Sequence, residues 1–88
     1  MSIKNVDDIT PGQCKAARAL LEFTQSDLAA AARLGLSTVV DFEKKRRQVS
    51  LAAIQAIRGA LAAQGVEFID ENGGGPGVRL RKRHQKKS

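Results

Sequence analysis

Apolar residues recur every three or four positions over most of residues 11–64, which is the period of an amphipathic α-helix. The pattern falls into four segments, and we expect helices over 11–22, 25–33, 36–45 and 51–64. The side chains expected to face inward are, in chain order, Cys14, Ala17, Leu20, Leu21, Leu28, Ala29, Ala32, Val39, Phe42, Leu51, Ile54, Ile57, Ala60 and Leu61. The pattern therefore predicts a mainly α fold built on a bundle of four helices.

Residues that favour helix termini support these boundaries. The sequence from Thr10 to Gln13 is a capping box, with a threonine hydroxyl at the N-cap, proline in the first turn and glutamine three residues on. Thr24 and Ser50 hold the same N-cap position before the second and fourth helices. Gly65 follows the fourth helix, where a left-handed residue commonly ends the helical turn.

The period changes after Gly65. The segments 66–70 and 78–82 alternate apolar and polar residues, and the glycine-rich segment 72–77 separates them. Alternation around a turn sequence predicts a β-hairpin over 66–82. The glycines are not expected to cradle a phosphate, because no Gly-Lys-Ser/Thr ending and no helix follow them.

Length and composition exclude several classes of protein. The chain has 88 residues, one cysteine (Cys14) and one histidine (His84), so neither a disulfide framework nor a metal site is expected. No nucleophile–base constellation is visible, and we expect neither enzymatic activity nor a cofactor. No apolar run approaches the roughly 18 residues of a membrane span, and the N-terminus lacks a signal sequence, so a cytoplasmic protein without membrane contact is expected.

Positive charge is concentrated in two places. The net charge is +6, and residues 79–88 hold six of the 15 basic residues and no acidic one, which leaves nine of each sign elsewhere. Lys44, Lys45, Arg46 and Arg47 form a second basic run. Concentrated positive patches favour a polyanionic partner, most simply nucleic acid, although solvated surface is the alternative for both.

The stretch 24–47 resembles the DNA-binding unit of the phage repressor/Cro-like regulators, the XRE family, and the similarity extends over roughly 10–63. Small or apolar residues stand at the family's spacing from Gln25, at Leu28, Ala29, Ala32, Val39 and Phe42. The resemblance implies a lambda-repressor-like helix-turn-helix bundle, here followed by the hairpin.

The sequence departs from that family at two turns. Arg33 and Lys45 stand where glycines are usual, and a side chain in a left-handed turn costs about 1 kcal/mol. Either Arg33 bears this strain, or the second helix runs slightly longer and Gly35 makes the turn or caps the third helix. We favour the second possibility.

The resemblance implies that helix 36–45 enters the major groove of double-stranded DNA. The expected base-reading residues are Ser37, Thr38, Val40, Asp41 and Lys44. The expected phosphate-binding residues are Thr24, Gln25, Lys45, Arg46 and Arg47. Ser37 and Thr38 could instead serve capping and solvation, and Asp41 could hold Lys44 or Lys45.

We therefore expect a small bacterial or phage transcriptional regulator, a repressor in the first instance, that is associated with the nucleoid when bound. The alternative is an antitoxin-type interaction module that binds a protein such as a toxin and regulates its own synthesis. The expected parts are an arm (1–9), a DNA-binding domain (10–65), the hairpin (66–82) as a candidate homodimerisation element and a disordered basic tail (83–88). Truncation after Gly65 would then leave a folded monomer.

Overall fold

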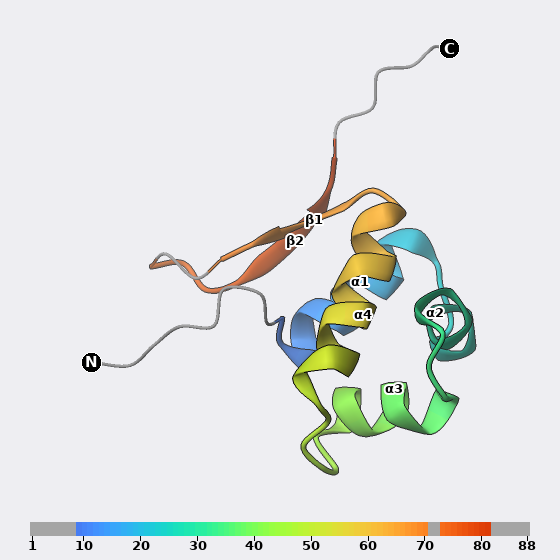
Figure 1. Ribbon diagram of the computed structural model, residues 1–88. Helices are drawn as coiled ribbons and strands as arrows, with labels where there is room; N and C mark the ends of the chain where they lie inside the picture. The colour runs from blue at the N-terminus through green and yellow to red at the C-terminus, as the bar shows by residue number, and fades with distance from the viewer. Residues whose placement is uncertain (1–8, 71–72, 82–88) are drawn as a thin grey trace, which may run out of the picture.

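The computed structural model describes residues 9–70 and 73–81, which form four helices followed by two antiparallel strands (Figure 1). The elements are α1 (Pro11–Leu21), α2 (Gln25–Ala32), α3 (Leu36–Lys44), α4 (Leu51–Ala63), β1 (Val66–Ile69) and β2 (Gly77–Leu80). The expected mainly helical chain with a C-terminal hairpin is confirmed at this level. Most of the predicted arm and the whole predicted tail lie outside the described residues, and none of the described helices is long and apolar enough to cross a membrane.

Local capping starts the helices as expected. Thr10 and Gln13 form a reciprocal capping box, in which the Gln13 N–H donates to Thr10 Oγ1 over 3.0 Å and the Thr10 N–H donates to Gln13 Oε1 over 2.9 Å. Thr24 caps α2 in the same reciprocal way with Asp27, and the Ser50 hydroxyl accepts from the Ala53 N–H. These bonds satisfy N–H groups that a helix start leaves without partners.

An apolar residue precedes each of these three caps and belongs to the core or packs against it. The pairs that stand just before the cap and at the fourth helical residue are Ile9 with Cys14, Phe23 with Leu28, and Val49 with Ile54. This is the spacing of a hydrophobic staple, which fixes the angle at which the chain enters a helix. The sequence therefore sets both the start of each helix and the direction from which the chain reaches it.

Each helix ends one residue earlier than expected, because the next residue leaves the helical conformation. Glu22, Arg33 and Lys45 have φ values of 59°, 60° and 58°, and after α4 the left-handed residue is Gly65. The favoured longer second helix is therefore wrong: α2 stops at Ala32 and Arg33 itself makes the turn. The part of the expectation in which Gly35 caps the third helix is confirmed, because Gly35 is the N-cap residue of α3. This cap has no side-chain hydrogen bond.

The core lies where the four helices meet and includes the first residue of β1. Leu28, Val39, Ile57, Leu61 and Val66 are almost wholly inaccessible. The inward positions expected for Leu20 and Leu51 are wrong, since their side chains are 43% and 44% exposed. Each lies at one end of its helix, where helical spacing continues but no neighbouring element covers the apolar stripe.

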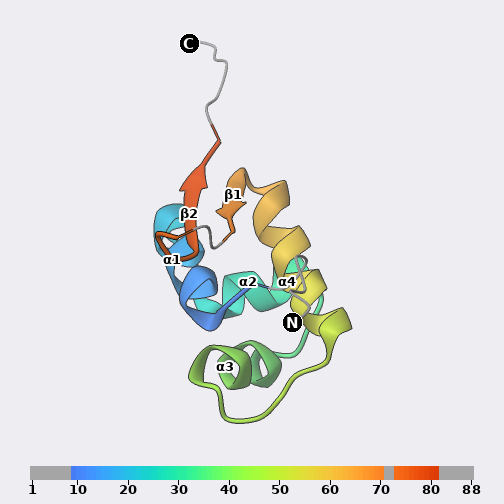
Figure 2. The same cartoon turned by 90° about the vertical axis from the view of Figure 1, so that its left-hand side faces the viewer.

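The hairpin packs on the helical body, with β2 alongside α1 and β1 alongside α4 (Figure 2). The register pairs Val66 with Leu80 and Phe68 with Val78. β1 ends one residue earlier than expected, on the side of the turn, whereas β2 begins one residue earlier than expected, at Gly77, and ends at Leu80. The buried Gln13 donates through Nε2 to the carbonyls of Ile69 and Gly77 over 3.3 and 3.0 Å. One glutamine side chain thus serves the capping box of α1 and fastens both strands to that helix.

Candidate nucleic-acid interface

Helix α3 has a buried side and an accessible side. Val39, Phe42 and Glu43 are buried, with exposures of 0%, 7% and 3%. The residues expected to read bases all lie on the accessible remainder: Ser37 and Lys44 are exposed, and Thr38, Val40 and Asp41 are half-buried. In both overall views α3 lies at the end of the molecule opposite to the C-terminal end of β2 (Figures 1 and 2). The helix is therefore open to a partner along one side.

Three side chains from α3 and the loop after it form a polar cluster. The Asp41 carboxylate accepts from Arg47 Nε over 2.8 Å, and Arg47 Nη2 lies 3.4 Å from Thr38 Oγ1. Asp41 therefore pairs with Arg47, whereas the sequence suggested Lys44 or Lys45. The cluster links a residue expected to bind phosphate with two expected to read bases.

The other basic residues of this run are free of such contacts. Lys44, Lys45 and Arg46 are exposed, and their side chains have no ion pair or hydrogen bond within residues 9–70 and 73–81. The backbone holds them in a tight turn, because the Lys45 N–H donates to the Phe42 carbonyl and the Arg46 N–H to the Asp41 carbonyl. Three unneutralised cations therefore project from the C-terminal end of α3.

The two candidates at the start of α2 are engaged within the protein. The Thr24 hydroxyl accepts from the Asp27 N–H. Gln25 Nε2 donates to Glu43 Oε1 over 3.0 Å, which ties the first residue of α2 to the last turn of α3. An amide nitrogen carries two hydrogens, so the Gln25 amide retains donor capacity beyond this bond.

Glu43 is the centre of a buried polar cluster between α1, α2 and α3. Arg18 binds it with two hydrogen bonds, from Nε to Oε2 over 2.7 Å and from Nη2 to Oε1 over 2.8 Å. Arg18 Nη1 also donates to the Phe23 carbonyl, and the Cys14 thiol lies 3.1 Å from Glu43 Oε2. A bidentate arginine–carboxylate pair of this kind fixes orientation as well as distance. The cluster therefore sets the position of α3 against α1 and the start of α2.

The cluster shifts the ionisation of its members. Burial alone raises the pKa of Glu43, but the hydrogen bonds from Arg18, Cys14 and Gln25, with the charge of Arg18, outweigh burial and hold it below its ordinary value. Burial, reinforced by the Glu43 carboxylate, raises the pKa of the Cys14 thiol far above its ordinary value. Glu43 is thus an anion and Cys14 a neutral thiol at neutral pH.

The sequence interpretation did not single out Glu43 or Arg18. A signal was present, because Val39, Phe42 and Glu43 share one helical face, as do Cys14, Ala17 and Arg18. An acidic residue on one inward stripe and a basic residue on another indicate a buried ion pair, since unpaired charges are almost never fully buried.

Two further basic residues, Arg79 and Arg81, lie in and just after β2, away from the basic run that follows α3. Arg79 pairs with Glu67 across the strands over 2.7 Å, and Arg81 donates to the Ala62 carbonyl at the end of α4. Within the described part of the chain, no group of three or more His, Cys, Asp or Glu side chains is placed to hold a metal ion.

The sequence was compared with models of protein families and with curated proteins, and it matches none of them.

Proposed function

We propose that this chain binds double-stranded DNA in a sequence-specific manner, as a small transcriptional regulator that acts by repression. In this proposal α2 and α3 form a lambda-repressor-like helix-turn-helix, and α3 lies in the major groove. The observation that carries the proposal is the pairing of two features on one helix. The accessible side of α3 presents short polar side chains, and its C-terminal end carries three unneutralised cations.

This arrangement suits the two tasks of a DNA reader. Hydroxyl groups such as those of Ser37 and Thr38 can donate to or accept from base edges, and Val40 offers an apolar contact for a thymine methyl group. Lys45 and Arg46 lie beyond the end of α3, where a flanking phosphate would lie. The start of α2 adds backbone N–H groups and the positive end of a helix dipole beside Gln25.

The central experiment separates base contacts from phosphate contacts. After selection of preferred sites from random duplexes, Ser37→Ala is expected to change preference at one or two base pairs by about 1–3 kcal/mol. Arg46→Ala is expected to weaken all sequences alike, since phosphates carry no sequence information. Arg46 is preferred to Arg47 because Arg47 also contacts Asp41 and Thr38. The placement of α3 would be wrong if Arg46→Ala changed sequence preference and Ser37→Ala did not.

Salt dependence provides an independent test. If each protomer neutralises about five to seven phosphates, the logarithm of the association constant should fall with the logarithm of salt concentration at a slope of roughly −4 to −6 per protomer. Fluorescence anisotropy on a labelled duplex at four or more salt concentrations measures this slope. A slope near zero on every duplex would contradict the proposed binding to DNA.

A second copy of the chain is the partner that we propose for DNA binding, because one recognition helix contacts few base pairs and dimers on two half-sites are a common solution. Leu80 supports the hairpin as the contact between copies, since it is 46% exposed at the end of β2, opposite the buried Val66.

Leu80→Ser should give monomers by light scattering and weaken binding to the preferred DNA site. Leu51→Ser, at 44% exposure on α4, is the matched control. Equal effects of both changes would reject the hairpin contact, and co-purification of another protein would favour the antitoxin-type alternative.

A further inference from the structure

Two apolar side chains on the accessible side of α3 take no part in the core. Leu36, the first residue of the helix, is 47% exposed, more than any other large apolar side chain in residues 9–70 and 73–81. Val40 is half-buried and stands four residues on, and residues with this spacing are neighbours on one helical face. Neither belongs to the core or packs against it. Leu36 and Val40 therefore form an apolar strip along the helix that we place in the major groove.

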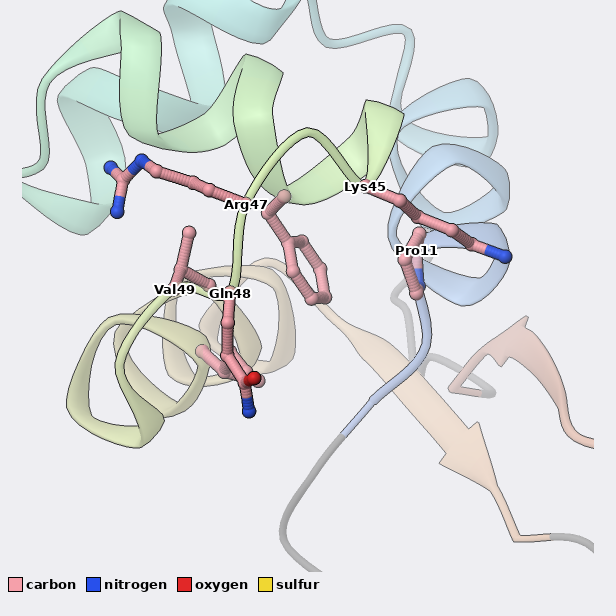
Figure 3. A pocket seen from close by; sticks show the side chains of 7 residues that line it. Pro11, Lys45, Arg47, Gln48 and Val49 are labelled. Carbon is pink, nitrogen blue, oxygen red and sulfur yellow. The ribbon is translucent and has the colours of Figure 1, made fainter.

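The charges around the apolar strip indicate the class of its partner. Asp41, the acidic side chain on the accessible side of α3, is already paired with Arg47. Lys44, Lys45 and Arg46 are exposed and unneutralised within the described residues. Beyond the end of the helix the Lys45 and Arg47 side chains point in opposite directions (Figure 3), so positive charge is spread over that end of α3. This setting favours a polyanion that carries apolar groups over an uncharged apolar protein surface.

DNA offers apolar groups of one kind in its major groove. The base edges present hydrogen-bond donors and acceptors there, and the exception is the methyl group on C5 of thymine. Cytosine carries the same group on the same ring carbon once it is methylated. Leu36 and Val40 have no polar side-chain atoms, so they cannot distinguish the O4 acceptor of thymine from the N4 donor of cytosine. The apolar strip can therefore recognise the methyl group but not the base that carries it.

We propose that Leu36 and Val40 bind the C5-methyl group of a pyrimidine in the major groove, on thymine or on 5-methylcytosine. This contact rests on the proposed function, because it requires α3 to lie in the groove. It makes Leu36 a specificity-determining residue in addition to those expected from the sequence. It also makes DNA binding responsive to methylation of cytosine at the contacted position.

The test uses the full chain and the preferred duplex selected from random sequences. Each pyrimidine is varied in turn as thymine, uracil, 5-methylcytosine and cytosine, with the complementary purine opposite. Thymine and uracil differ by one methyl group, as do 5-methylcytosine and cytosine, so each pair measures the gain in affinity from that group. At the contacted position we expect a gain of about three- to fivefold in both pairs, as for one buried methyl group. No gain at any pyrimidine, or a gain in the thymine pair alone, would overturn the proposal.

Three variants assign the methyl gain to Leu36. Leu36→Ala should reduce it in both pairs, whereas Leu36→Met keeps a long apolar side chain and should retain it. Leu51→Ala, the same change at 44% exposure on α4, is the matched control and should also retain it. All proteins are measured on the same duplexes, so any effect of the methyl group on DNA shape is common to them. A gain that persists unchanged in Leu36→Ala would reject the assignment.

Partial unfolding of a variant does not mimic the expected result. A methyl gain is the ratio of two affinities measured on one protein sample, so a smaller folded fraction lowers both affinities and leaves their ratio unchanged. Light scattering without DNA tests the other occupant of the apolar strip. A change of oligomeric state in Leu36→Ala would overturn the proposal and assign the strip to a contact with a second copy of the chain.

The salt titration keeps this proposal distinct from the proposed function. A steep salt slope without a methyl gain would retain DNA binding and reject only the recognition of the methyl group. A slope near zero on every duplex would reject both.

Discussion

At the scale of single residues, the most consequential side chain in this structure is Glu43. It is 3% exposed and receives hydrogen bonds from Arg18, Gln25 and the Cys14 thiol. A buried carboxylate is tolerated only when its charge and lone pairs are satisfied, and here two residues of α1 and one of α2 satisfy them. The side chain that holds the proposed recognition helix in place is therefore not one that would touch DNA.

Glu43→Gln should show how much this cluster contributes to stability. The change removes the negative charge and leaves the Arg18 guanidinium, 20% exposed, without its counter-ion. We expect the free energy of unfolding to fall by about 2–3 kcal/mol in urea denaturation, slightly below the range of about 3–5 kcal/mol for a fully buried pair. Glu67→Gln, which breaks the exposed pair with Arg79, is the matched control and should cost less than about 1 kcal/mol. If Glu43→Gln and Glu67→Gln lowered the free energy of unfolding by similar amounts, the buried pair would contribute no more to stability than the exposed one.

The same carboxylate predicts the direction of a pH effect. The pKa of Glu43 lies below its ordinary value of 4.5 in the folded chain, because hydrogen bonds and the Arg18 charge outweigh burial. Its contribution to stability is therefore complete above the unfolded pKa and is lost as the pH falls through the folded pKa. The difference in unfolding free energy between wild type and Glu43→Gln should shrink as the pH falls below about 4.5. A difference that stayed constant down to pH 3 would contradict this assignment.

At the scale of elements, the turns between helices depend on residues that are poorly suited to them. Glu22, Arg33 and Lys45 all adopt the left-handed conformation that glycine accepts more readily. The Arg33 N–H still donates to the Ala30 carbonyl and the Leu34 N–H to the Ala29 carbonyl, so the turn at the end of α2 is closed by hydrogen bonds. Tertiary packing of α2 and α3 therefore overrides the local preference of Arg33.

Arg33→Gly should relieve this strain. The side chain is exposed, and we expect the substitution to raise the free energy of unfolding by about 0.5–1 kcal/mol. Arg33→Ala keeps a β-carbon in the same conformation and is the control that should give no gain. Thermal and urea denaturation of the three proteins measure the effect. If Arg33→Ala raised the free energy of unfolding as much as Arg33→Gly, the gain would not come from relief of the left-handed backbone conformation.

At the scale of the whole molecule, the hairpin is part of the same core as the helices. Val66 is 1% exposed, Gln13 bonds both strands, and the Arg58 guanidinium lies 5.2 Å from the centre of the Phe68 ring. The Arg81 N–H donates to the Gly65 carbonyl over 2.7 Å and so joins the two ends of the hairpin, and the Arg81 guanidinium donates to the Ala62 carbonyl in α4. Because of these contacts, removal of the hairpin should destabilise the helical body.

Truncation after Gly65 was expected to leave a folded monomer, and the packing now predicts an unstable one. Loss of Val66, Phe68 and Val78 uncovers the core, so we expect the free energy of unfolding to fall by at least about 3 kcal/mol. Leu80→Ala in the full chain removes only half-exposed surface and should cost about 0.5 kcal/mol or less. Circular dichroism during heating compares the two. An unchanged melting temperature after truncation would mean that the hairpin does not stabilise the body.

The sequence by itself determined the elements of this protein, since their signals are local. A cap at Thr10, Thr24 or Ser50 acts on an N–H three residues away, and the helical period needs only neighbouring turns, so both are readable along the chain. The tertiary structure alone decided which helix ends are covered, as the exposed Leu20 and Leu51 show. It also decided that Glu43 meets Arg18, 25 residues away, and that Gln13 reaches carbonyls 56 and 64 residues away. Helical spacing can mark Glu43 and Arg18 as charges on inward faces, but which residues meet depends on how the elements pack, and no periodicity within one element contains that information.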